Sequence, residues 1–156
     1  MKTLVLYATK YGAARKIAES LAESLSDADL CNIKEGYPTN FAKYDCVIIG
    51  SSVYAGSIRP EAKAFIAQAV SALEGKRLGL FICGMDAQRY EDCLKKNYPA
   101  EILQQAVVTD FLGGIFDPAK ANFAERTIFR AASKLSSYQN TIDVEKIKQF
   151  AQAMET

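Results

Sequence analysis

Residues 3–14 read TLVLYATKYGAA, and this stretch decides the expected fold. It opens with TLVLYA, an apolar run rich in residues that favour β-strands. A Gly stands at position 12, and an apolar stripe at helical spacing begins at Ala14. A run that is continuously apolar, rather than alternating, is typical of a strand buried on both faces. The stretch therefore predicts a buried strand, a tight turn and a helix.

The same order of elements recurs through the rest of the chain. Further strands are expected at Asp29–Ile33, Asp45–Gly50, Arg77–Cys83 and Ala106–Leu112. Helices are expected at Ala14–Leu25, at Pro60–Leu73, within Tyr90–Gln105 with a break near Pro99, from Asp117-Pro118 to about Leu135, and after a capping Asp143. Strands that alternate with helices predict an α/β fold, with a parallel sheet covered on both sides. Five strands in 156 residues favour a single domain, residues 1–156, with the strand order 2-1-3-4-5.

Composition excludes several classes of function. The chain has no His, which excludes Ser-His-Asp and Cys-His hydrolases and most zinc or haem sites, so no metal site is expected. The net charge of +1 gives no strong field for nucleic acid. The four cysteines form no C-x-x-C pair, no apolar run approaches the length of a membrane span, and no signal peptide is recognisable. We therefore expect a complete, cytoplasmic protein whose chemistry comes from a bound cofactor.

Three loops are the expected ligand site. Ligands of such sheets bind beyond the carboxyl ends of the strands, where the strand order reverses. That rule selects the loops Thr9–Ala14, Ser51–Arg59 and Gly84–Tyr90. The first opens a helix, whose free N–H groups can hold a phosphate, and its Gly12 permits the tight curl that this requires. A plain strand-to-helix turn is the alternative reading of that loop.

The second and third loops carry aromatic rings between small residues. Tyr54 follows Gly50-Ser51-Ser52-Val53 and offers a face for stacking, and Tyr90 follows Gly84-Met85-Asp86 and offers a second. The chain has neither G-x-x-x-x-G-K-[ST] nor G-x-G-x-x-G, so neither a triphosphatase P-loop nor the NAD fingerprint is present. A nucleophilic serine is not expected without a His base. A phospho-receiver domain is excluded because Gly50-Ser51 ends the strand where that class needs an acidic residue.

On these segments the chain resembles the flavodoxin superfamily. Thr9 and Gly12 match its first loop, where Tyr11 and Ala14 replace hydroxyl residues. Gly50–Tyr54 resembles the Gly-x-Ser-Thr-Trp segment, although Ala55 separates the aromatic residue from Gly56. Gly84-Met85-Asp86 with Tyr90-Glu91-Asp92-Cys93 resembles the Gly-x-Asp … Tyr-Glu-x-x-Cys segment. The opening MKTLVLY, the Gly-x-Ser-Val segment and a helix-rich insertion after Gly113-Gly114, at about residues 115–140, are similar to the flavodoxin-type, menaquinone-dependent protoporphyrinogen dehydrogenases.

The resemblance implies a three-layer flavodoxin-like sandwich that binds FMN without a covalent bond. Its phosphate would lie on the first loop and its ring between the second and third. The residues implied to bind FMN are Thr9, Lys10, Tyr11, Gly12, Ala13, Ala14, Ser51, Ser52, Val53, Tyr54, Ala55, Gly56, Gly84, Met85, Asp86 and Tyr90. No catalytic residue is implied. The function would be that of an oxidoreductase of the protoporphyrinogen dehydrogenase-like branch, with a redox partner protein, a quinone or a small molecule as partner.

Two alternatives and one further surface stay open. The chain could be an electron carrier of the flavodoxin kind with no substrate of its own, or a flavodoxin-like domain that no longer binds flavin. Residues 119–135 are locally basic, with Lys120, Arg126, Arg130 and Lys134 against Glu125. A basic helix of this kind either presents a solvated face or lies on an anionic membrane or a partner.

Overall fold

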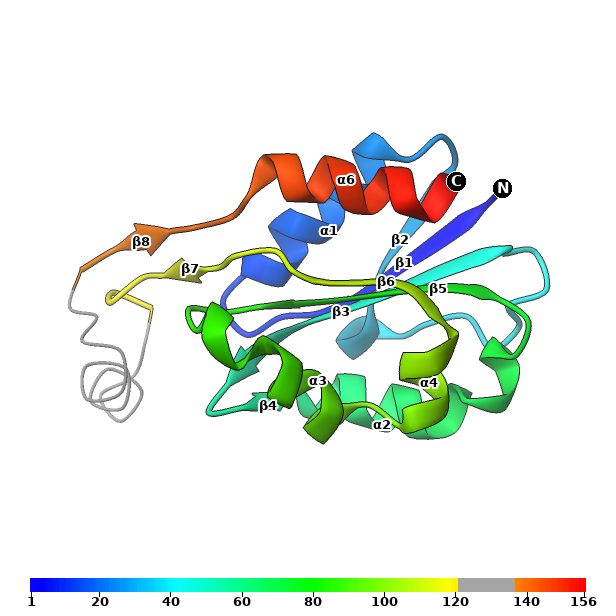
Figure 1. Cartoon of the computed structure of the whole chain (residues 1–156), viewed down its shortest axis with the longest axis horizontal. Coiled ribbons are helices and arrows are strands. Elements are labelled where there is room, and N and C mark those ends of the chain that lie inside the picture. Colours follow the sequence, from blue (N-terminus) through cyan, green and yellow to red (C-terminus); the bar gives the residue numbers. More distant parts are fainter. Residues whose placement is uncertain (121–136) are drawn as a thin grey trace.

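The computed structural model describes residues 1–120 and 137–156. Within these residues, five parallel strands form the main sheet in the order β2-β1-β3-β5-β6 (Figure 1). They are β1 (Thr3–Ala8), β2 (Ala28–Asn32), β3 (Cys46–Tyr54), β5 (Arg77–Cys83) and β6 (Ala106–Phe111). A short β4 (Ser57–Ile58) pairs only with β3, in the antiparallel sense. Without β4 the order is 2-1-3-4-5, and the predicted α/β topology is confirmed.

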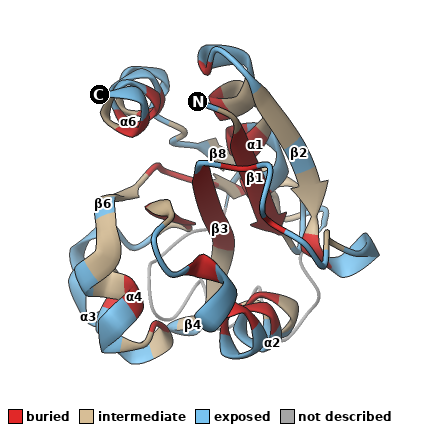
Figure 2. Cartoon of the chain, turned by 90° about the vertical axis from the view of Figure 1, so that its right-hand side faces the viewer, coloured by how far each residue is buried: buried red, intermediate tan, exposed pale blue. Residues whose placement is uncertain are grey.

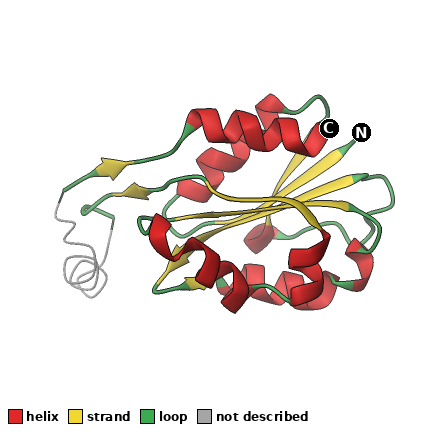
Figure 3. Cartoon of the chain, in the orientation of Figure 1, coloured by secondary structure: helices red, strands yellow, loops and turns green. Residues whose placement is uncertain are grey.

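Helices cover both faces of this sheet (Figures 1 and 3). On one face lie α1 (Ala13–Ser24) and α6 (Val144–Glu155); on the other lie α2 (Pro60–Ala69), α3 (Tyr90–Asn97) and α4 (Ala100–Gln105). Pro60 opens α2, as predicted, because a helix loses nothing when its first N–H is missing. The side chain of Asp143 accepts a hydrogen bond from the Lys146 N–H and caps α6, also as predicted.

The two faces of the sheet form two separate hydrophobic cores. In β1 the side chains of Leu4 and Leu6 pack toward α2, whereas Val5 and Tyr7 pack toward α1 and α6. All of β1 is buried, as Figure 2 shows for the centre of the sheet. This burial on both faces is the reason that the strand reads as a continuous apolar run rather than an alternating one.

The structure differs from the sequence-based prediction in two respects. The stretch Ser51–Tyr54, expected as loop, continues β3, because Ser51 and Ser52 pair with Ile82 and Cys83 of β5. Single-turn 3₁₀ helices also occur: η1 (Ile33–Glu35), η2 (Ser71–Leu73) and η3 (Ala87–Arg89).

The chain leaves and re-enters the body beyond β6 through a short ribbon. β7 (Ile115–Phe116) pairs antiparallel with β8 (Gln139–Asn140), so the described ends of the expected helical insertion at about 115–140 are strands. Residues 118–120 form a turn, and the rest of the helix predicted up to Leu135 lies outside the described residues. In the described part of the chain, no helix combines the length and the apolar composition needed to cross a bilayer.

Candidate functional site

The three predicted loops meet at one edge of the sheet. Strand register aligns Ala8 of β1 with Ser51 of β3, and Ser52 of β3 with Cys83 of β5. The loops that follow β1 and β5 and the end of β3 therefore lie side by side. A fourth segment, after β6, joins them: the Gly84 N–H donates to the Gly113 carbonyl, and a side chain at Gly114 would collide with the Gly84 backbone. The sequence analysis did not predict that this segment after β6 takes part in the site.

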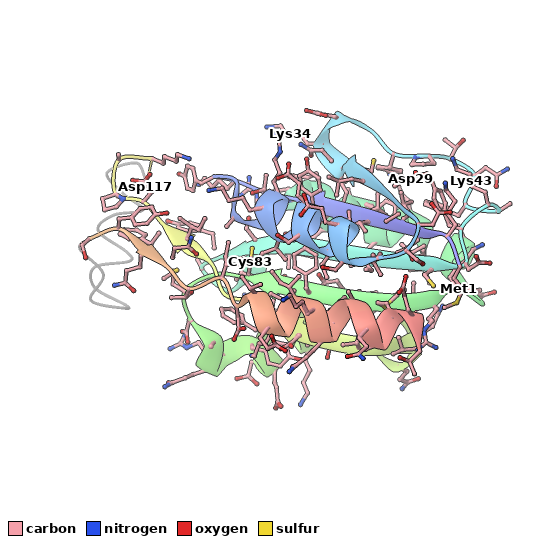
Figure 4. The ribbon with its side chains drawn as sticks, turned by 90° about the horizontal axis from the view of Figure 1, so that it is seen from above. Met1, Asp29, Lys34, Lys43, Cys83 and Asp117 are labelled. Carbon is pink, nitrogen blue, oxygen red and sulfur yellow. The ribbon has the colours of Figure 1, made fainter. Side chains whose placement is uncertain are left out.

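A small cavity of about 60 Å³ lies between these four segments. Its lining residues are Lys10, Tyr11, Ala13, Ser52, Val53, Tyr54, Cys83, Gly84, Met85, Gly114, Ile115, Phe116 and Asp117. Figure 4 shows Asp117 at this end of the molecule, far from Asp29 and Lys43. The cavity thus brings eight of the implied binding residues together, from all three predicted loops.

The first loop has the geometry of an anion site. Gly12 has a φ of +104°, which favours glycine, and its N–H donates to the hydroxyl of Thr9 at 2.9 Å. A Cβ at position 12 would meet no atom of the described residues within 4 Å, so these residues leave the space beside the turn open. The first turn of α1 contains no acidic residue. The N–H groups of this turn therefore have no competing negative charge on the same turn.

The ammonium group of Lys10 lies beside two tyrosine rings near this turn. The Lys10 ammonium lies 4.8 Å from the centre of the Tyr54 ring and 5.3 Å from that of Tyr11. Both distances lie within the range of a cation–π contact. Arg15, by contrast, is drawn one turn along the helix by a 2.8 Å ion pair with Glu19. Lys10 is therefore the cation placed between the first loop and the aromatic residue of the second.

Two adjacent serines in β3 have opposite surroundings. The Ser51 hydroxyl is buried, donates to the Ser52 carbonyl and accepts from the Arg59 N–H, both at 2.9 Å. The Ser52 hydroxyl is also buried, but it has no hydrogen-bond partner among the described residues, and Ser52 lines the small cavity. Ser51 is thus a structural residue, whereas Ser52 holds a polar atom that a ligand could satisfy.

A larger cavity of about 610 Å³ adjoins the first and shares four of its lining residues. The shared residues are Val53, Tyr54, Gly84 and Met85. The cavity is otherwise lined by Ala55, Gly56, Ile82, Asp86, Arg89, Tyr90, Asp92, Cys93, Lys96 and Phe111. Its volume is in the range of small-molecule sites, and its walls combine apolar side chains with a few charges.

Tyr90 lines this larger cavity with its hydroxyl anchored. Its hydroxyl lies 3.0 Å from the Thr109 carbonyl and 2.9 Å from the Thr109 hydroxyl, on β6. Arg89, next to it, lies 3.5 Å from Asp86 in an exposed ion pair. Tyr54 and Tyr90 therefore both line the larger cavity, Tyr54 from the second predicted loop and Tyr90 from the third.

A tight hairpin turn forms the outer wall of the larger cavity. Tyr54 of β3 pairs with Ser57 of β4, and only Ala55 and Gly56 connect them. Both have positive φ, +51° and +77°, as a two-residue turn of type I′ requires. From α3, the side chain of Asn97 donates to the Gly56 carbonyl at 2.9 Å.

The buried thiols around the site are protonated. Burial raises the pKa of Cys83 to about 12, and burial also raises the pKa of Cys93. Neither residue therefore has the thiolate character that a nucleophile needs. Of the implied residues, Thr9, Gly12, Ala14 and Ser51 lie outside both linings; Ala14 and Ser51 are buried.

The sheet order and the loops at its switch point define a doubly wound α/β protein whose candidate ligand site lies at the carboxyl ends of its strands. Comparison with known proteins makes the assignment specific. Residues 4–143 match the flavodoxin domain family, and the chain belongs to that family. The predicted flavodoxin-like fold is confirmed.

Individual relatives are more distant. The chain is 28% identical over 95 residues to protoporphyrinogen IX dehydrogenase [quinone] of Escherichia coli K12, covering 58% of this chain and 52% of the relative. It is 26% identical over 150 residues to the enzyme of the same name from Leishmania major, covering 86% of this chain and 63% of the relative. This chain therefore spans about half to two thirds of the curated relatives it matches.

A solved flavodoxin shares the fold. The Fusobacterium nucleatum flavodoxin bound to flavin mononucleotide has a TM-score of 0.60 and 14% identity, with 99% of this chain and 95% of that chain covered.

Proposed function

We propose that this chain binds FMN at the edge of the sheet formed by the three loops, and that it is an oxidoreductase of the protoporphyrinogen dehydrogenase-like branch. The observation that carries the proposal is the Ser52 hydroxyl, a buried polar atom that finds no partner within residues 1–120 and 137–156, at the wall of a cavity framed by all three loops. In a folded protein such an atom costs free energy unless something binds it. The family match and the relatives named as quinone-dependent dehydrogenases support the same assignment.

The residues present fit FMN in three places. The first turn of α1 offers N–H groups to the phosphate, the turn at Gly12 leaves open space beside it, and Lys10 lies nearby. The Ser52 hydroxyl offers a hydrogen bond at the cavity wall. The two tyrosines of the larger cavity, Tyr54 and Tyr90, offer aromatic surface to a ring. The phosphate site thus depends mainly on backbone groups, so the hydroxyl residues absent at Tyr11 and Ala14 are not required.

The protein's own contribution is binding, orientation and exclusion of water. Bound FMN supplies the redox chemistry, because it accepts electrons singly or in pairs. The hydroxyl of Tyr90 is held by Thr109, which fixes that ring at the cavity wall. Val53, Ile82 and Phe111 make the inner wall of the larger cavity apolar, and an apolar wall disfavours a charged form of any ring that lies against it.

The first test is the visible spectrum of the purified chain, followed by titration with FMN and with riboflavin. We expect a flavin spectrum, acid release of FMN, and weaker binding of riboflavin because it lacks the phosphate. Tyr54→Ala should weaken FMN binding by roughly 1 kcal/mol or more, about fivefold, while Tyr138→Ala, an exposed tyrosine outside both linings, should not. Equal binding of FMN and riboflavin would remove the first loop from the site.

Activity is the second test. The FMN-loaded chain should oxidise protoporphyrinogen with a quinone as acceptor, in a reaction that we place in the cytoplasm. Absence of turnover, with FMN bound, would contradict the branch assignment and leave FMN binding intact. Contact of residues 119–135 with a membrane stays a prediction, because residues 121–136 lie outside the described part of the chain.

An electron carrier without its own substrate is the second candidate. Exposed acidic residues, Asp86, Glu91 and Asp92, lie near the rim of the larger cavity and could meet a basic partner protein. The net charge of +1 favours the enzyme, because electrostatic steering of a basic partner needs an acidic surface. Rapid reduction by a flavodoxin reductase, without protoporphyrinogen turnover, would favour the carrier.

A further inference from the structure

The lining of the larger cavity contains four charged residues, and two of them neutralise each other. Arg89 and Asp86 form an exposed ion pair at 3.5 Å. Asp92 and Lys96 are the other two, and both belong to α3. They are four residues apart, a spacing at which side chains on one helix can meet. In the described part of the chain, however, neither of them forms an ion pair.

The ammonium group of Lys96 lies beside the hairpin turn rather than against Asp92. Its Nζ is 3.6 Å from the position that a Cβ on Gly56 would take. The turn at Gly56 is the outer wall of the larger cavity, and α3 lies next to β4 (Figure 1). Lys96 is exposed, so its charge lies where the cavity meets solvent, without direct contact with a carboxylate of the described residues.

A second ammonium group adds to the positive potential at this wall. Burial raises the pKa of the Cys93 thiol, and the hydrogen bond from Asn97 acts in the opposite direction. The charges of Lys96 and Lys63 also act to lower it. Cys93 lines the larger cavity, and Lys63 belongs to α2. Cations from two helices therefore lie near the same part of the wall, where they attract an anion.

The phosphate of FMN does not account for this charge. Lys10 lines the small cavity at the first loop, whereas Lys96 lines only the larger of the two cavities that the described residues form. A phosphate held at the first turn of α1 therefore leaves Lys96 without an anion. The charge of Lys96 is available to a second ligand in the larger cavity.

We propose that Lys96 is a specificity-determining residue, which binds a carboxylate of the substrate at the outer end of the larger cavity. The inference rests on the proposed function and deepens it, because it names the group of the substrate that the chain recognises. Protoporphyrinogen, the substrate in that proposal, carries two propionate side chains on a largely apolar ring system. The apolar wall of Val53, Ile82 and Phe111 suits the ring system, and the ammonium group suits one propionate.

The experiment measures the binding of two porphyrins to the FMN-loaded chain. Protoporphyrin IX, the oxidised product, has both free carboxylates, and its dimethyl ester has neither charge. Titration followed by porphyrin fluorescence, in the same dilute detergent, gives both dissociation constants without turnover. We expect the wild-type chain to bind the dicarboxylate about three- to fivefold more tightly than the ester, as for an ion pair open to solvent. This preference should shrink at about 0.5 M salt.

Three variants locate the preference on one side chain. Lys96→Met should remove it, because methionine keeps an apolar stem and loses the charge, and Lys96→Arg should retain it. Lys95→Met is the matched control. Lys95 is the preceding residue of α3, is equally classed as exposed, and lies outside both cavity linings. Since both methionine variants remove one positive charge from the last turn of α3, only the position of that charge relative to the cavity differs.

The outcomes separate this inference from the proposed function. If the wild-type chain binds FMN but binds neither porphyrin, or binds both equally, the inference is wrong and FMN binding stands. If Lys96→Met keeps the wild-type preference, or if Lys95→Met loses it to the same extent, the inference is also wrong. If Lys96→Met weakens FMN binding and leaves the preference unchanged, Lys96 acts on the flavin and not on the substrate. If the wild-type chain does not bind FMN, the proposed function fails and this inference falls with it.

Discussion

Replacing Ser52 by alanine should change the stability of the ligand-free chain and its affinity for FMN in opposite directions. The Ser52 hydroxyl is buried and has no hydrogen-bond partner in the described part of the chain, and a buried polar group in that condition costs about 1–3 kcal/mol. Removing it should therefore raise the stability of the ligand-free chain by about 1 kcal/mol, which corresponds to roughly 2–4 °C in melting temperature for a domain of this size.

The same substitution should weaken FMN binding. If the hydroxyl donates to the ligand, its loss removes one hydrogen bond, worth about 1 kcal/mol, and raises the dissociation constant about fivefold. The assay is thermal melting without ligand and at saturating FMN, together with fluorescence titration. The rise in melting temperature that FMN produces should be smaller in Ser52→Ala than in the wild-type chain.

Ser51→Ala is the matched control in the next position of the chain. Its hydroxyl has both a donor and an acceptor partner, so its removal leaves the Arg59 N–H without its acceptor. We expect destabilisation by about 1–3 kcal/mol. A fall in the stability of ligand-free Ser52→Ala, or an unchanged affinity of that variant for FMN, would refute the assignment of Ser52 to the site.

Three further predictions follow from single contacts. Tyr98→Phe should leave the melting temperature unchanged or raise it, because no described residue forms a hydrogen bond with the buried Tyr98 hydroxyl. Tyr44→Phe should lower the melting temperature, since the Tyr44 hydroxyl donates to Asp29 at 2.6 Å. The Tyr44 hydroxyl, with Lys2 and Lys43, lowers the pKa of Asp29 in the folded chain. The stability that the ionised Asp29 carboxylate gives the fold is therefore fully present above the unfolded-state pKa of about 3.9. It is lost as the pH falls through the lower folded-state pKa. Melting curves of Asp29→Asn should therefore lose less stability between pH 5 and 2 than wild type, and an equal loss would contradict this assignment. In the folded chain iodoacetamide should modify the partly exposed Cys31 before the buried Cys46, Cys83 and Cys93. Peptide mass spectrometry at successive times measures this order. Modification of Cys83 before Cys31 would contradict the burial and the raised pKa of the Cys83 thiol.

Continuous apolar runs made the parallel sheet predictable. β1 and β5 begin and end where the sequence predicts, because both faces of each strand are buried and no alternation confuses the pattern. The end of β3 was not predictable. Ser51 and Ser52 read as loop residues, and their place in the sheet depends on pairing with Ile82 and Cys83 of β5, far away in the sequence.

The site was predictable to the level of loops but not of individual atoms. The rule for parallel sheets locates the ligand edge, and it needs only the strand order. It cannot distinguish Ser51 from Ser52, since the side chains of adjacent strand residues point to opposite faces. It also gave no signal for Asn97, a single polar residue at the end of α3 whose side chain bonds to Gly56 and Ile58, outside that helix. The pair Gly113-Gly114 was the feature from which the contact of this segment with Gly84 could have been predicted, because a glycine pair often marks a close approach of backbones.

The β7–β8 ribbon has a consequence for how this protein can vary. Its register aligns Ile115 with Asn140 and Phe116 with Gln139, so the connection between the strands starts and finishes at neighbouring points. Because Ile115 and Phe116 also line the small cavity, a substitution that changed this pairing would change the wall of the candidate site, although neither strand belongs to the main sheet.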